Sequence, residues 1–367
     1  GANDVTLDTP ANDFGGAVNV TGGAVTLVDV NAIDLGTVTA ASLNVTAGGN
    51  VTDSGTLSVT GTTTVNAGAN DVTLDTPAND FGGAVNVNGG AVTLVDVNAI
   101  DLGNVTAASL DVTAGGNVTD SGTVTVTGTT TVNAGANDVT LNTPTNDFGG
   151  AVNVTGGAVT LVDVNAIDLG NVTAASLDVT AGGNVTDSGT LSITGTTTVN
   201  AGANDVTLDT PANDFGGAVD VTGGAVTLVD VNAIDLGNVT AASLDITAGG
   251  NVTDSGTLSI TGTTTVNAGV NDVTLDTPAN DFGGTVNVTG GAVTLVDVNA
   301  IDLGNVTAAS LDVTAGGNVT DSGTLSITGT TTVNAGANDV TLNTPANDFG
   351  GAVNVTGGAV TLVDVNA

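Results

Sequence analysis

The sequence lacks most of the side chains that carry protein chemistry. None of its 367 residues is Lys, Arg, His, Cys, Met, Trp, Tyr, Glu or Gln, and all 37 acidic residues are Asp, so the formal net charge is -37. Without imidazole, thiol or amine side chains, a carboxylate is the only general base available. Without cationic side chains to neutralise phosphate, the composition excludes nucleic-acid binding by the usual electrostatic route. The common zinc, haem and iron–sulfur ligand sets are excluded together with His and Cys.

Long hydrophobic runs are also missing. Hydrophobic residues make up 40% of the chain, but no run approaches the ~18 residues that a membrane helix needs, so we expect no membrane insertion of this segment. Disordered chains are poor in β-branched residues, whereas Val and Thr are abundant here. The composition therefore predicts a folded chain whose core is aliphatic, because only six residues are Phe.

Tandem repetition is the strongest pattern in the sequence. The string GANDVTLDTP begins at Gly1, and close relatives of it recur at a constant interval, at Gly68, Gly135, Gly202, Gly269 and Gly336. We expect one continuous domain of five repeats (1–67, 68–134, 135–201, 202–268 and 269–335) and a partial repeat, 336–367. The first two repeats differ at only five positions. Such near-identity leaves no repeat with an active site of its own, so we expect no enzyme.

Each repeat contains shorter strand-like segments. Val5-Thr6-Leu7, Val25-Thr26-Leu27 and Val51-Thr52-Asp53 are three versions of one segment, which returns at Val72 in the next repeat. Alternating apolar and polar residues favour strands with one buried face. The steps from Val5 to Val25, from Val25 to Val51 and from Val51 to Val72 are therefore interpreted as three coils per repeat. Aliphatic side chains inside such coils predict an all-β fold, a parallel β-solenoid or β-helix.

The same alignment predicts an unbroken outward column of Thr. The column begins with Thr6, Thr26, Thr52, Thr73, Thr93 and Thr119. A ladder of β-branched hydroxyl side chains suits an exposed face of a sheet.

Segments such as AVNVTGGAVTLVDVNAIDLG and SLNVTAGGNVTDSGTLSVTG resemble the β-strand repeats of very large bacterial surface proteins, the filamentous-haemagglutinin-like and autotransporter-like adhesins. The resemblance covers the whole chain and lies in composition and rhythm. It implies a right-handed β-helical stalk that is exported to the cell surface, with adhesive tips elsewhere in the protein.

Stacked acidic loops make calcium the main candidate ligand. We expect Asp8 and Asp13 in the loop of the first coil and Asp29 and Asp34 in the loop of the second coil directly above. Their equivalents in the next repeat are Asp75, Asp80, Asp96 and Asp101. Carboxylate and amide oxygens suit Ca²⁺, and divalent ions would relieve the repulsion along so acidic a molecule. The alternative is that these are ordinary solvated turn residues, since Asp and Asn favour turns.

The triplet Asp53-Ser54-Gly55 invites an enzymatic interpretation. Aspartic proteases carry such a triplet, two copies of which share a proton. Successive copies here are predicted to lie three coils apart, about 14 Å at the strand spacing of a sheet, so we expect turns instead. Glycoside hydrolysis needs only two carboxylates, and a polysaccharide-acting β-helix enzyme therefore stays an alternative, as does an ice-binding solenoid that uses the Thr column.

The sequence as a whole favours a structural role. We expect a rigid β-helical stalk or filament of an extracellular adhesin or matrix protein that self-associates end to end. A calcium-stabilised sheath or surface-layer component is the alternative.

Overall fold

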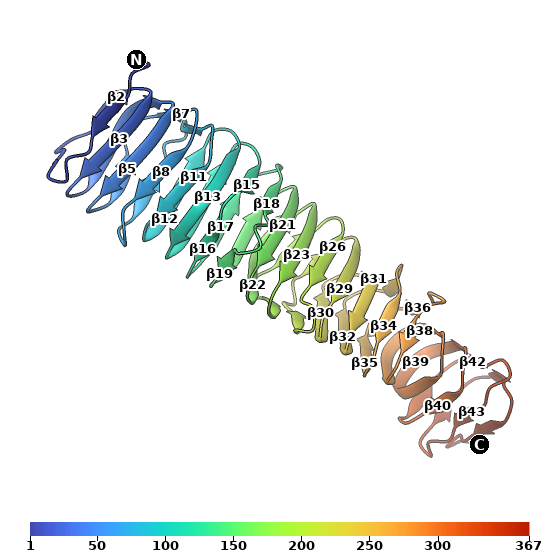
Figure 1. Ribbon diagram of the computed structural model, residues 1–367. Coiled ribbons are helices and arrows are strands. Elements are labelled where there is room, and N and C mark those ends of the chain that lie inside the picture. The colour runs from blue at the N-terminus through green and yellow to red at the C-terminus, as the bar shows by residue number, and fades with distance from the viewer. Residues whose placement is uncertain (367) are drawn as a thin grey trace. The chain divides into compact units, whose positions relative to one another are not determined.

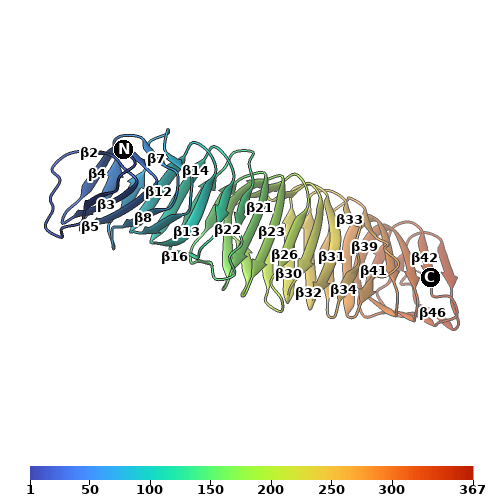
Figure 2. The ribbon, with the colours of Figure 1, turned by 45° about the horizontal axis from the view of Figure 1, so that its top comes forward.

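The computed structural model describes residues 1–366 as two compact units, Gly1–Gly182 and Gly183–Ala367. Each unit is a β-solenoid in which the strands pair in parallel with those of the next coil, and Figure 1 shows the strands of each unit side by side. Figure 2 shows the turns that join the strands at the edges of the coils. No helix occurs in the described residues. The predicted all-β parallel solenoid is confirmed.

The first unit contains 23 strands. They are β1 (Val5–Leu7), β2 (Val18–Thr21), β3 (Ala24–Asp29), β4 (Ile33–Ala40), β5 (Ser42–Ala47), β6 (Val51–Asp53), β7 (Leu57–Val59), β8 (Thr63–Asn66), β9 (Val72–Leu74), β10 (Asp80–Phe81), β11 (Val85–Asn88), β12 (Ala91–Asp96), β13 (Ile100–Ala107), β14 (Ser109–Ala114), β15 (Val118–Asp120), β16 (Val124–Val126), β17 (Thr130–Asn133), β18 (Val139–Leu141), β19 (Asp147–Phe148), β20 (Val152–Thr155), β21 (Ala158–Asp163), β22 (Ile167–Ala174) and β23 (Ser176–Ala181).

The second unit also contains 23 strands. They are β24 (Val185–Asp187), β25 (Leu191–Ile193), β26 (Thr197–Asn200), β27 (Val206–Leu208), β28 (Asp214–Phe215), β29 (Ala218–Thr222), β30 (Ala225–Asp230), β31 (Ile234–Ala241), β32 (Ser243–Ala248), β33 (Val252–Asp254), β34 (Leu258–Ile260), β35 (Thr264–Asn267), β36 (Val273–Leu275), β37 (Asp281–Phe282), β38 (Thr285–Asp297), β39 (Ile301–Ala315), β40 (Val319–Asp321), β41 (Leu325–Ile327), β42 (Thr331–Asn334), β43 (Val340–Leu342), β44 (Asp348–Phe349), β45 (Val353–Thr356) and β46 (Val360–Leu362).

Coil length follows from the pairing register. Val5 pairs with Val25, Val25 with Leu43, Leu43 with Thr63 and Thr63 with Val85. Successive coils therefore run over 5–24, 25–42, 43–62 and 63–84, and they differ only slightly in length. The predicted first step, from Val5 to Val25, is confirmed.

The predicted second step, from Val25 to Val51, is wrong. Strand β6 pairs instead with β4, so Val51 pairs with Ile33. On its other side β6 pairs with β9, so Val51 pairs with Val72 as predicted. The segments Leu43–Val45 and Val51–Asp53 both alternate apolar and polar residues. Leu43–Val45 is the nearer of the two to Val25 along the chain. Pairing with it keeps the coil short.

The order of strands repeats after seven coils in the first unit. Strands β3, β5, β8, β11, β13, β15, β18 and β21 form one row, so β21, the equivalent of β3 two repeats further along the chain, lies in the same row as β3. The residue pairing shifts by two positions along this row, because Val25 aligns with Leu102 and Val159 aligns with Ile100. The second unit repeats this order of strands between β30 and β46. The prediction of about three coils per repeat is confirmed, and along this row two repeats make seven coils.

Equivalent strands of neighbouring repeats therefore lie in different rows. Strand β12 is the equivalent of β3, yet it belongs to a second row formed by β2, β4, β6, β9, β12, β14, β17, β20 and β22. The predicted unbroken Thr column is wrong for the same reason, because Thr26 pairs with Asn44 and Thr93 with Asp111. The Thr column on which the ice-binding alternative depended is interrupted in both rows.

The core is aliphatic and continuous through the coils of each unit. Along β3, Val25 and Leu27 are at most 1% exposed while Thr26 faces outward, as the alternation predicts. Four Phe side chains, Phe81, Phe148, Phe215 and Phe282, are the largest that are fully buried. Burial of apolar surface between adjacent coils is the main stabilising contribution in such a stack.

Candidate functional site

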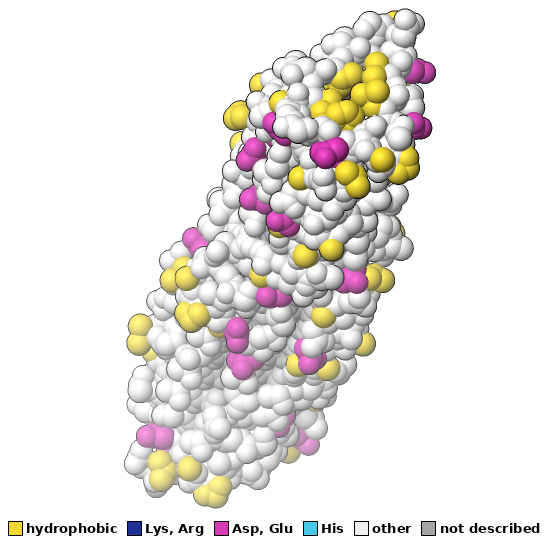
Figure 3. Space-filling model, turned by 90° about the vertical axis from the view of Figure 1, so that its left-hand side faces the viewer, with side chains coloured by type: hydrophobic (Ala, Val, Ile, Leu, Met, Phe, Trp, Pro, Cys, Tyr) yellow, Lys and Arg dark blue, Asp and Glu magenta, His cyan; other side chains and the backbone are white. Residues whose placement is uncertain are grey.

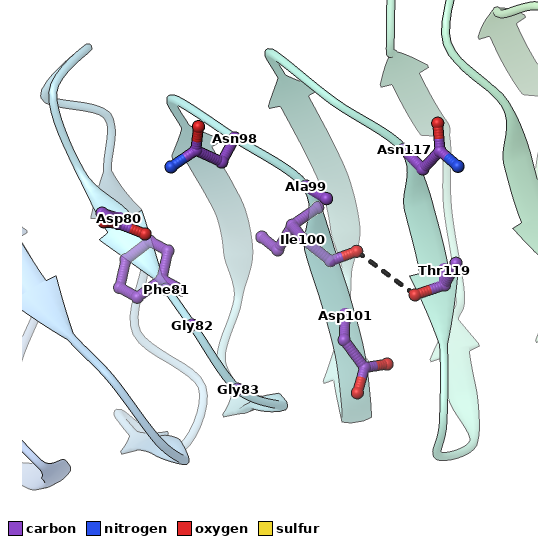
Figure 4. Close-up of a pocket in the computed structure, with 10 residues that line it drawn as sticks. All are labelled: Asp80, Phe81, Gly82, Gly83, Asn98, Ala99, Ile100, Asp101, Asn117 and Thr119. Carbon is purple, nitrogen blue, oxygen red and sulfur yellow. Dashed lines mark hydrogen bonds between the residues drawn. The ribbon is translucent and has the colours of Figure 1, made fainter.

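Two of the predicted calcium ligands in each of the first two repeats line one surface hollow. In the second repeat the hollow has a volume of about 240 Å³, and Asp80 and Asp101 line it together with Asn98, Asn117 and Thr119. Figure 4 shows these side chains on adjacent coils, with the Thr119 hydroxyl donating to the carbonyl oxygen of Ile100 at 3.5 Å. In the first repeat, Asp13 and Asp34 line the equivalent hollow, of about 440 Å³.

Strands, rather than loops, position several of these carboxylates. Asp80 lies on β10 and Asp101 on β13, while Asp34 lies on β4, so the expected loop placement of Asp34, Asp80 and Asp101 is wrong. One carboxylate oxygen, Oδ2, accepts a hydrogen bond from a serine of the next coil: Ser54 Oγ on Asp34 at 2.7 Å and Ser121 Oγ on Asp101 at 2.8 Å.

The other oxygen, Oδ1, of both Asp34 and Asp101 is buried and has no hydrogen-bond partner among the described residues. Asp80 lines the hollow of the second repeat, and Asp13 lines the hollow of the first.

Asp29 and its equivalents have a different environment from the one predicted. Asp29 and Asp96 end strands β3 and β12, and each is only 2% exposed. Both oxygens of Asp96 accept main-chain hydrogen bonds: Oδ2 from Phe81 N of the preceding coil at 3.0 Å, and Oδ1 from Asn98 N at 2.8 Å. Asp29 makes the same two bonds, to Phe14 N and Asn31 N. These carboxylates hold two coils together, and neither Asp29 nor Asp96 lines a hollow.

Asp8 and Asp75 lie apart from the hollows. Both are exposed, just after β1 and β9, and neither lines the hollows of the two repeats. The main-chain N–H of Asp75 donates to Asp53 Oδ1 at 2.9 Å. The predicted set is thus divided among three environments: the hollow, the buried contact between coils, and the exposed turn.

The described residues contain no group of three or more acidic side chains arranged to hold a metal ion. The hollow offers two carboxylates with amide oxygens nearby, and Ca²⁺ takes six to eight oxygen ligands. Calcium binding at Asp13–Asp34 and Asp80–Asp101 stays a prediction. Isothermal titration of the chelator-treated chain with CaCl₂ tests it, and a matched chain carrying Asp34→Asn and Asp101→Asn is the control. Saturable heat that the control lacks would support the sites, and heat equal in both chains would contradict them.

The Asp53-Ser54-Gly55 triplet forms a junction between coils. Asp53 Oδ2 accepts from the Asn79 amide nitrogen at 2.7 Å, and Asn79 Oδ1 accepts from Leu57 N at 2.8 Å. Ser54 N donates to Leu35 O of the preceding coil at 2.9 Å. Asn79 is fully buried. Asp53 is the last residue of β6, and only Ser54 and Gly55 form a bend, so the predicted turn holds for those two residues alone. The Asp53 carboxylate bonds to the loop that precedes Phe81.

Neither the buried Asp29 contact nor the buried Asn79 contact was predicted from the sequence. For Asp29, the sequence did contain a signal of burial. Val25, Leu27 and Asp29 are every second residue of one strand, so strand alternation alone places Asp29 inward with the core residues. Asn79 carries no such signal, because it lies in an irregular loop whose depth the strand pattern does not define.

The acidic surface is spread out. Figure 3 shows single Asp side chains separated by uncharged surface on the face that it draws. No cationic side chain exists anywhere in the sequence to pair with them. The chain therefore repels itself electrostatically, and salt screens that repulsion.

The fold and the repeated contacts between coils define this chain as a tandem-repeat β-solenoid protein. The family described as repeats of unknown function (DUF5649) matches residues 1–21, 22–88, 89–155, 156–222, 223–289 and 290–356, and the chain belongs to that family. The complete family repeats have the predicted length of 67 residues, but their boundaries differ. The first complete family repeat covers 22–88, whereas repeats at 1–67 and 68–134 were predicted from the sequence. No curated protein and no solved structure matches the chain. In the described residues, no helix is long and apolar enough to cross a membrane.

Proposed function

We propose that this chain is a non-catalytic, length-bearing segment, a rigid β-helical stalk or filament of an extracellular surface protein. The observation that carries the proposal is the continuous register within each unit, in which every interior coil is bonded to the coil before it and the coil after it. Near-identical repeats that each add the same coils produce extension and stiffness rather than a single binding centre. The resemblance to bacterial adhesin repeats supports the extracellular setting.

Repeat number should set length. At ~4.8 Å per coil, one repeat of three and a half coils contributes about 17 Å along the axis. Deleting residues 89–155 removes one complete family repeat without changing the pattern at the junction. Small-angle X-ray scattering of the purified chain and of the deletion variant tests the proposal. A maximum dimension shorter by the length of one repeat supports it, and unchanged dimensions would contradict it.

Cell-surface exposure has its own test. Antibodies raised against the purified chain should label intact source cells as strongly as permeabilised ones. Labelling that requires permeabilisation would contradict the extracellular part of the proposal and leave the length-bearing part standing.

Self-association is the third part of the proposal. Strand β1 pairs with β3 and strand β46 pairs with β43, and among the described residues the other edge of β1 and of β46 has no partner. Leu7 and Leu362 are each 41% exposed. Such an edge favours pairing with another strand, and a second copy of the chain offers one. Sedimentation velocity should show concentration-dependent assembly that Val360→Lys with Leu362→Lys reduces. A single monomeric species at all concentrations would contradict it.

A further inference from the structure

Four buried aspartates recur in the solenoid at the ends of β12, β21, β30 and β38: Asp96, Asp163, Asp230 and Asp297. Each is only 1–2% exposed, although no cationic side chain exists in the chain to pair with it. In each, Oδ2 accepts from the main-chain N of a Phe in the preceding coil at 3.0–3.2 Å. Oδ1 accepts from an Asn N two residues later at 2.7–2.8 Å.

The surroundings of these carboxylates disfavour the charged form. Burial raises the pKa of Asp96 from its ordinary value, and the negative charge of Asp80 on the preceding coil raises that pKa further, while the two N–H donors, Asn98 and Phe81, oppose the rise. Asp163, Asp230 and Asp297 have raised pKa values for the same causes, with Asp147, Asp214 and Asp281 as the neighbouring charges. Every side chain in the molecule that can titrate is an Asp, so no neighbour on any packed strand compensates.

We propose that the buried aspartates make the solenoid tighten in mild acid, as proton-binding positions at the contacts between coils. A proton taken up there removes a buried negative charge and one carboxylate–carboxylate repulsion per site. In the protonated carboxyl group the carbonyl oxygen still accepts one main-chain N–H strongly, and the hydroxyl oxygen accepts the other more weakly, so the contact between coils is retained. The biological consequence rests on the proposed function. In an extracellular stalk, acidification would stabilise the stack of coils at each of the four buried aspartates.

The sign of the pH dependence follows from linkage. Because the pKa of these groups is higher in the folded chain than in the unfolded chain, the folded chain binds more protons as the pH falls through the folded pKa. Stability from these groups is therefore fully present below the ordinary Asp value of about 3.9 and is lost as the pH rises through the folded pKa. Most acid-labile proteins, whose carboxylates have lowered pKa values, change in the opposite direction.

Thermal unfolding from pH 7 to pH 4 in 1 M NaCl tests the proposal, because high salt screens the general repulsion among exposed carboxylates. We expect Tm to rise by several degrees as the pH falls. The matched control replaces the exposed Asp111, Asp178, Asp245 and Asp312 with Asn, the residue that the first repeat carries at Asn44. The control should keep the rise. A Tm that is flat or falling in the native chain would overturn the proposal.

The variant that replaces Asp96, Asp163, Asp230 and Asp297 with Asn should lose the pH dependence of Tm, whatever its absolute stability. If that variant fails to fold, ¹³C NMR titration of the carboxyl carbons in the native chain decides the question. Four carboxyl groups that titrate at higher pH than the exposed ones support the proposal. Titration of every Asp together would overturn it, and neither result depends on whether the chain is extracellular.

Discussion

Residues 1–21 and 68–88 have the same sequence except for Thr21 and Asn88, yet their structures differ. In the later segment Val72 and Leu74 are fully buried and Phe81 is 2% exposed. In the first segment Leu7 is 41% exposed and Phe14 is only half-buried. The strand that Asp80–Phe81 forms as β10 is absent at residues 13–14. The later segment has a coil on both sides, and the first has a described coil on one side only.

The difference shows that burial and even strand formation come from the neighbouring coil rather than from local propensity. Asn79 illustrates it: the residue is fully buried and bonded to Asp53 and Leu57 of the coil before it. Its counterpart Asn12 donates to Leu7 O of its own coil at 3.0 Å in an exposed bond. Stability in such a stack is a sum of coil terms and contacts between nearest neighbours.

The largest contrast should come from truncating the core. Leu74→Ala removes a fully buried side chain and leaves a cavity, so we expect a loss of about 2–5 kcal/mol. Leu7→Ala should cost less than about 1 kcal/mol, because Leu7 is 41% exposed and its site can relax. Hydrogen exchange of the amides in β9 and β12 measures the first loss and exchange in β1 and β3 the second. Equal losses at the two sites would break the comparison.

A smaller contrast is expected at the asparagine. Asn79→Ala leaves Leu57 N and Asp53 Oδ2 without this partner in a buried place, at a cost of about 1–3 kcal/mol. Asn12→Ala removes one exposed hydrogen bond and should change stability by only a few tenths of a kcal/mol. Denaturant unfolding of the two variants measures both. If Asn12→Ala lowers the free energy of unfolding as much as Asn79→Ala does, the bonds of Asn79 to the preceding coil are not the source of its contribution to stability.

The smallest effect is a gain. Thr63 is fully buried in β8, and its Oγ1 has no hydrogen-bond partner among the described residues. Thr63→Val keeps the shape and removes the unpaired hydroxyl, so we expect a gain of about 1 kcal/mol. Thr64→Val, on the outward side of the same strand, is the control and should give no comparable gain. Thermal unfolding measures both, and destabilisation by Thr63→Val would show that the hydroxyl is satisfied.

The sequence predicted the fold class, the repeat length and the inward side chains, because alternation and periodicity are local properties. It did not predict the pairing of Val25 with Leu43. Several segments of a repetitive sequence match the same alternation, so the pattern alone specifies the pairing register only weakly. In this structure Val25 pairs with Leu43, the nearer of the two matching segments along the chain. Of the predicted site, Asp13 with Asp34 and Asp80 with Asp101 come together. Asp29 does not join them, since its position in the strand alternation directs it inward.

The register itself is the central claim, and a chain without cysteine allows a direct measurement. In-register neighbours on parallel strands lie about 4.8 Å apart, within the Cα separation that a disulfide requires. Thr26→Cys with Asn44→Cys should therefore form an intramolecular disulfide on mild oxidation, because Thr26 pairs with Asn44. Thr26→Cys with Thr52→Cys should remain reduced. Cross-linking of the second pair and not the first would contradict the seven-coil register and the account built on it.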